Sequence, residues 1–95
     1  MSVKTGIEFN EKNGYTYVTV DGKEVAKMAF VFEDKNTIII NHTEVNPGYN
    51  GKGFGNMMLD KAVAVAREKK IKIIPVCPFV KSVFDKTPDF RDVLK

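Results

Sequence analysis

The sequence is poor in cysteine, histidine and long apolar runs, and each shortage excludes a class of protein. Its one cysteine cannot form a disulfide within the chain, which suits a reducing compartment. No stretch approaches the roughly 20 apolar residues that span a bilayer, and the first residues lack the apolar segment of a secretory signal. We therefore expect a cytoplasmic protein without membrane association, in which the glycosylation pattern at Asn41 is a chance match.

Metal and nucleic-acid chemistry have little support in the composition. One cysteine and one histidine leave no cluster of typical zinc ligands, so no metal is expected. The net charge of +3 is mild and no stretch alternates aromatic with basic residues, so nucleic acid is not an expected partner. The charge suits a small anionic ligand better. Three lysines gather at Lys69, Lys70 and Lys72, which is more typical of a solvated helix end.

The first half of the chain predicts an antiparallel meander within a single domain over residues 1–95. Short β-rich segments are separated by Asn13-Gly14 and Asp21-Gly22, which are strong hairpin signals. Consecutive isoleucines at positions 38–40 suggest a central strand buried on both faces. The expected strands cover residues 7–11, 15–20, 25–33 and 37–45.

The second half predicts a helix, a strand and a second helix. Residues 56–70 have helical periodicity, and a helical crossover would place the strand at 71–76 parallel to its predecessor. A last helix is expected from Pro78 to before Pro88. The fold class is therefore α+β, a mixed α/β sheet built from a four-stranded meander, a helix, a parallel strand and a C-terminal helix. The expected core-facing residues of the helices are Gly55, Met58, Leu59, Ala62, Val65, Ala66, Phe79, Val80, Val83 and Phe84.

A glycine-rich turn lies between the last strand of the meander and the first helix. Gly51, Gly53 and Gly55 let the backbone approach an anion closely, and the free N–H groups at the helix start add partial positive charge. Lys52 adds a favourable charge at longer range. The spacing fits neither a P-loop nor a dinucleotide fingerprint. The plainer alternative is a tight strand-to-helix connection with no ligand.

The segment from Val45 to Gly55 resembles the coenzyme A signature of the GNAT acetyltransferases. The family pattern is a Gln/Arg-x-x-Gly-x-Gly/Ala turn, and here Asn50 is followed by Gly51, Gly53 and Gly55. Residues 42–45, 76–80 and 88–90 narrow the resemblance to very short single-domain members, over nearly the whole chain. The resemblance implies acetyl-CoA bound by Val45, Asn50, Gly51, Lys52, Gly53, Phe54, Gly55, Asn56, Cys77 and Phe79.

Two departures from the family pattern bear on function. Asn50 stands where Gln or Arg is usual, which removes one charge-assisted contact with the pyrophosphate and predicts weaker affinity. The chain also lacks the helices that most members insert between their first two strands. Because those helices help to build the acceptor site, the sequence does not identify the acceptor.

Cys77 is the first of three candidate catalytic residues. It precedes an expected helix, whose N-terminus can lower the pKa of a thiol. In the short GNAT-like group this position lies near the thiol end of the coenzyme, which implies an acyl-accepting nucleophile, a wall of the acyl pocket or a redox partner. The alternative is a small buried apolar residue.

His42 and Glu44 are the other two candidates. His42 lies two residues past Ile40, on the same face of a regular strand, and Glu44 shares that face. Either is a candidate general base. The alternative for His42 is a structural role that shapes the site without moving protons.

The sequence therefore predicts an acetyl-CoA-dependent N-acyltransferase of unknown acceptor. The alternative is a module that binds acyl-CoA without turnover, which the missing helices and Asn50 both favour. A monomer is the simpler expectation, while an uncovered sheet edge leaves room for a weak dimer.

Overall fold

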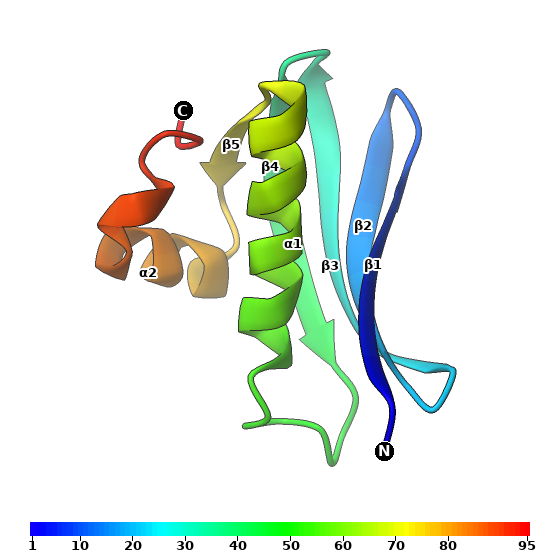
Figure 1. Cartoon of the computed structure of the whole chain (residues 1–95). Coiled ribbons are helices and arrows are strands. Elements are labelled where there is room, and N and C mark those ends of the chain that lie inside the picture. The colour runs from blue at the N-terminus through cyan, green and yellow to red at the C-terminus, as the bar shows by residue number, and fades with distance from the viewer.

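A computed structural model describes all 95 residues and shows a five-stranded sheet with a long helix across one face (Figure 1). The strands follow the chain in the order β1-β2-β3-β4-β5. The first three pairs are antiparallel and β4 with β5 is parallel, which confirms the predicted fold class. The elements are β1 (Val3–Phe9), β2 (Asn13–Val20), β3 (Lys23–Asp34), β4 (Thr37–Val45), α1 (Phe54–Lys69), β5 (Lys72–Pro75), α2 (Pro78–Lys86) and a 3₁₀ turn (Pro88–Phe90).

The first hairpin lies earlier than the sequence predicted. The turn follows Asn10, whose side-chain Oδ1 accepts the backbone N–H groups of Lys12 and Asn13. Gly14 is inside β2, opposite Phe9, where a Cβ atom would come within 2.3 Å of the Phe9 Cβ. Asn13-Gly14 is therefore not the turn, because the Asn10 side chain forms it and the glycine instead permits close cross-strand contact.

The three consecutive isoleucines are not buried on both faces. Ile38 and Ile40 are buried in the core, whereas Ile39 is half-buried and pairs with Val31 and Ile74 in the neighbouring strands. Figure 1 shows α1 on one side of the sheet and no helix on the other. The prediction was wrong because a short α+β chain supplies a single covering layer.

The apolar stripe of α1 was predicted correctly over most of its length. Two of the predicted residues are half-buried rather than buried. Gly55 faces Phe79, and Val65 lines a narrow apolar groove beside β1. The buried residues of α1 are Phe54, Met58, Leu59, Ala62, Val63 and Ala66.

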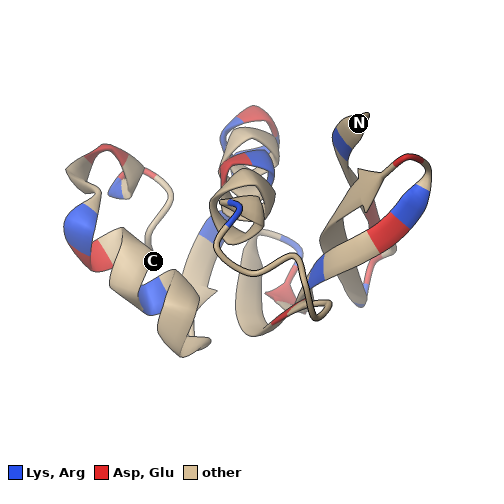
Figure 2. Cartoon of the chain, turned by 90° about the horizontal axis from the view of Figure 1, so that it is seen from below, with Lys and Arg blue, Asp and Glu red and all other residues tan.

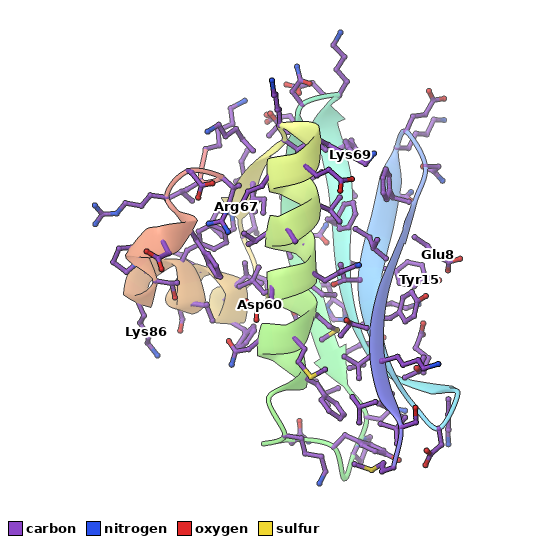
Figure 3. The ribbon with its side chains drawn as sticks, viewed as in Figure 1. Glu8, Tyr15, Asp60, Arg67, Lys69 and Lys86 are labelled. Carbon is purple, nitrogen blue, oxygen red and sulfur yellow. The ribbon has the colours of Figure 1, made fainter.

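The end of the chain closes the β5 edge of the sheet. Leu94 forms a parallel bridge with Ile73, and α2 lies beside β5 (Figure 1). Arg67 of α1 holds this segment through two hydrogen bonds to the Asp92 carboxylate, of 2.8 and 2.9 Å, and its side chain extends from α1 in Figure 3. None of the helices combines the length and the apolar composition of a membrane-spanning segment.

Candidate active site

Three glycines with left-handed backbone carry the chain from β4 to α1. Gly48 has φ of 90°, Gly51 of 78° and Gly53 of 79°, a region that other residues rarely adopt. A Cβ atom at any of them would meet nothing within 4 Å, so the constraint is conformational rather than steric. Gly53 is the N-cap of α1, and its conformation therefore sets the direction in which the helix begins.

The first backbone N–H groups of α1 have no hydrogen-bond partner within the protein. No side chain caps it, and its first turn contains no acidic residue. The N–H of Met57 makes the first hydrogen bond of the helix, to the Gly53 carbonyl. The preceding N–H groups of Phe54, Gly55 and Asn56 make no such bond. Together with the helix dipole, these amides form a site suited to an anion such as a pyrophosphate.

The amides open onto a cleft of about 490 Å³ between the glycine turn, β4 and α2. This volume is within the range of roughly 300–1,000 Å³ typical of small-molecule sites. Figure 2 looks onto this end of the molecule, with the turn in front of α1. The cleft is lined by Thr43, Val45, Tyr49, Asn50, Gly51, Gly53, Phe54, Gly55, Asn56 and Phe79.

Phe79 forms one wall of the cleft rather than part of the core. It is 37% exposed, in contrast to the buried Phe84 of the same helix. Gly55 allows this position, because a Cβ atom there would lie 2.7 Å from the Phe79 ring. Prediction of Phe79 as a core residue was thus wrong, and its assignment to the ligand site stays a prediction. Tyr49, which also lines the cleft, stacks on Phe54 with ring centroids 6.1 Å apart.

Strands β4 and β5 separate beside this cleft. Their last pair is Ile40 with Pro75, and the Ile40 carbonyl then accepts the N–H groups of both Val76 and Cys77. Beyond that point β4 has β3 as its only strand neighbour. The gap that remains runs along the free edge of β4.

The peptide groups of Thr43 and Val45 face this gap. The N–H of Asn46 bonds to the Val25 carbonyl, and antiparallel hydrogen bonding alternates along a strand. In the observed register Thr43 and Val45 are therefore the residues whose N–H and C=O groups point away from β3. The free edge of β4 thus offers donors and acceptors to an extended ligand.

Cys77 lies at the inner end of the gap, at the N-cap of α2. Its side chain is 7% exposed, and its Sγ lies 3.3 Å from the Thr43 hydroxyl oxygen. Burial raises the pKa of the thiol, but hydrogen bonds from the Thr43 hydroxyl and from the backbone amides of Val80, Phe79 and Thr43 outweigh it. The net result is a Cys77 pKa below its ordinary value, which favours the reactive thiolate.

The Thr43→Val variant tests this coupling. Valine keeps the shape of threonine but removes the hydroxyl that stabilises the thiolate, so the pKa of Cys77 should rise. We expect alkylation of Cys77 by iodoacetamide to become slower at neutral pH, with the midpoint of its pH profile displaced upward. Thr43→Ser, which keeps the hydroxyl, is the control. An unchanged profile for Thr43→Val would show that the hydroxyl does not stabilise the thiolate.

His42 and Glu44 do not lie on the face that the sequence predicted. The register between β3 and β4 slips so that Ile40 pairs with Phe30 and His42 with Ala29, which leaves Asn41 as an extra residue. This bulge reverses the alternation, so His42 and Glu44 point away from α1 and the cleft. The two side chains are about 60% exposed and lie 3.5 Å apart.

The structure thus brings most of the predicted ligand-binding residues together. Val45, Asn50, Gly51, Gly53, Phe54, Gly55, Asn56 and Phe79 line the cleft. Two predicted residues lie outside the lining: Lys52 is exposed on the turn, and Cys77 is buried beside Thr43. Sequence reasoning did not assign roles to Thr43 and Tyr49. The same bulge explains the omission of Thr43, because a regular strand would place it on the opposite face. No group of three metal-ligating side chains is present.

Comparisons with known proteins agree with this geometry. The profile of a family described as GCN5-related N-acetyl-transferase matches residues 15–93. A GCN5-like protein from Staphylococcus aureus is 32% identical with a TM-score of 0.69, over 95% of this chain and 87% of that one. A ribosomal-protein-alanine N-acetyltransferase from Brucella melitensis is 12% identical with a TM-score of 0.75, over 90% of each chain, which shows likeness of fold. No curated protein matches the sequence.

Proposed function

Because the chain belongs to the GCN5-related N-acetyltransferase family, we propose that it transfers an acetyl group from acetyl-CoA to an amine. The observation that carries the proposal is the uncapped N-terminus of α1, which opens through a glycine turn onto a cleft beside the free edge of β4. A helix start, a flexible backbone and an unpaired strand edge are the features that a pyrophosphate with an extended amide arm requires.

The pyrophosphate would bind to the amides of Phe54, Gly55 and Asn56. Gly51 and Gly53 hold the turn in the conformation that lets these donors converge. Asn50 lines the same cleft and contributes a neutral amide side chain, while Lys52 contributes charge from the exposed side of the turn. The pantetheine arm would then follow β4, pairing with the carbonyl groups of Thr43 and Val45, which face the gap.

The thioester would lie at the inner end of this path, close to Cys77. The N–H of Val45 faces the gap and would polarise the thioester carbonyl. The Cys77 thiolate would attack the carbonyl carbon, and the bond to the coenzyme sulfur would break as the coenzyme leaves and takes up a proton. An amine would then attack the acetyl-cysteine, releasing the thiolate and losing a proton to solvent.

Direct attack of the amine on the thioester is the other route. It needs a proton acceptor, for which Glu44, His42 or water are the candidates. Glu44 and His42 lie on the face of β4 opposite the cleft, so they would serve only an amine that enters through the gap from that side. We favour the route through Cys77, because its sulfur contacts a residue that lines the cleft.

A second candidate function is binding of acyl-CoA without turnover. The turn between β1 and β2 holds only residues 10–12, so no helix covers the acceptor side there. Asn50 in place of Gln or Arg also predicts weaker binding than a dedicated enzyme shows.

Release of free thiol from acetyl-CoA, measured with a panel of primary amines, tests the proposed activity. We expect thiol release that depends on an amine and yields the acetylated amine in equal amount. Saturable binding without amine-dependent release would leave the non-catalytic module. Absence of binding at about 1 mM acetyl-CoA would contradict both candidate functions, because the binding free energy would then be smaller in magnitude than about 4 kcal/mol.

A further inference from the structure

Strand β1 is an open edge of the sheet, on the side away from the cleft. Its only strand partner is β2, and α1 faces its apolar side across a narrow groove that Ile7, Phe9 and Val65 line (Figure 1). The other edge, at β5, is covered by the C-terminal segment through the bridge between Ile73 and Leu94. The molecule thus protects one edge and leaves the other free to pair.

The hydrogen bonds to β2 identify the free backbone groups of β1. The N–H of Asn10 bonds to the Asn13 carbonyl, and the N–H of Asp21 bonds to the Ser2 carbonyl. Between them the register has no bulge, so even-numbered residues of β1 bond inward. The outward N–H and C=O groups therefore belong to Val3, Thr5, Ile7 and Phe9.

We propose that β1 pairs antiparallel with β1 of a second copy of this chain, with Gly6 of each copy on the two-fold axis. In this register Thr5 lies opposite Ile7, and Val3 lies opposite Phe9. Every outward N–H and C=O of the four odd-numbered residues then has a partner. The two five-stranded sheets join into one continuous sheet.

The side chains of β1 are self-complementary in the same register. Lys4 lies opposite Glu8 of the second copy, and neither has an ion-pair partner in its own chain. Glu8 accepts a hydrogen bond of 2.6 Å from the Tyr15 hydroxyl and stays exposed (Figure 3). On the other face, Phe9 is 43% exposed and would be covered by Val3 of the second copy.

Gly6 suits the position on the axis. Residues of a non-hydrogen-bonded antiparallel pair have their Cα atoms only about 4.5 Å apart, so a glycine eases the approach of two identical backbones. The Tyr17 side chain already fills the space above Gly6, where a Cβ atom would come within 2.3 Å of its hydroxyl oxygen. Sliding the register by two residues in either direction would separate Lys4 from Glu8 and leave outward groups unpaired.

Sedimentation of the full chain from about 10 µM to 1 mM tests this interface. Because a single pair of edge strands buries little surface, we expect a dissociation constant of roughly 0.1–1 mM. Lys4→Glu and Glu8→Lys should each weaken self-association roughly tenfold, since like charges then face each other twice. An equimolar mixture of the two variants should regain association, because positions 4 and 8 are both acidic in one variant and both basic in the other, so opposite charges face each other twice.

Two further variants control for folding and for the Tyr15 contact. Thr5→Pro removes an outward N–H at an edge position that tolerates proline, and it should leave a folded monomer with unchanged binding of acetyl-CoA. Tyr15→Phe removes the bond to Glu8 but should leave self-association intact. The proposal would be overturned by a wild-type chain that stays monomeric at 1 mM, by a dimer insensitive to Thr5→Pro, or by a mixture that fails to regain association.

Discussion

Replacing Gly53 by valine is expected to weaken the binding of acetyl-CoA roughly 100-fold. Gly53 has φ of 79° at the N-cap of α1, where a β-branched residue costs on the order of 1–3 kcal/mol. The turn would relax to negative φ and redirect the first amides of α1. Losing two charge-assisted hydrogen bonds of about 1.5 kcal/mol each corresponds to this loss of affinity. Isothermal titration calorimetry provides the measurement.

Gly22→Val is the matched control. Gly22 has φ of 84° in the turn between β2 and β3, and it too has nothing within 4 Å of a built Cβ atom. The two variants should therefore lose similar thermal stability, but only Gly53→Val should lose affinity. Equal affinity of the two variants would show that the turn conformation does not organise the binding site.

Replacing Cys77 by alanine is expected to lower the rate of acetyl transfer about 1,000-fold or more, the typical effect of removing a nucleophile. The thiol is buried and its removal leaves a small space, so the fold and the affinity for acetyl-CoA should persist. Rapid mixing of the native protein with acetyl-CoA, followed by intact mass spectrometry, should show one acetyl group on Cys77.

The same experiment distinguishes the two routes of transfer. Cys77→Ser replaces the thiol with a hydroxyl of similar size, and because the hydroxyl is a weaker nucleophile this variant should be nearly as slow as Cys77→Ala. Full activity of Cys77→Ala, with loss in Glu44→Gln, would instead assign direct transfer to the amine. In that case Cys77 would be a wall of the acyl pocket beside Thr43.

Most of the fold follows from patterns that are local in the sequence. The Asp21-Gly22 turn, the β4 strand and the change to helical periodicity after the glycines predict the element order. The first hairpin was misplaced because an Asn10 side chain, rather than a glycine dipeptide, forms the turn. The predicted burial on both faces at Ile39 was wrong because only one face of the sheet is covered by a helix, a tertiary feature that periodicity does not encode.

The candidate site was predictable where its motif is backbone-based and unpredictable where it depends on register. Gly51 and Gly53 could be assigned because only glycine adopts their conformation readily. The bulge at Asn41 has no residue signature, and it alone decides that Thr43 faces the cleft while His42 faces away. The position of Phe79 depended on contact with Gly55, which is distant in the sequence.

An amide NMR titration with acetyl-CoA tests the central claim most directly, because it reports on each residue of the cleft separately. We predict shifts centred on Val45, on residues 51–56 and on Cys77, with the amides of β1 unchanged. Absence of shifts at these positions at about 1 mM ligand would contradict the account. The glycines would then be a tight strand-to-helix turn without a ligand.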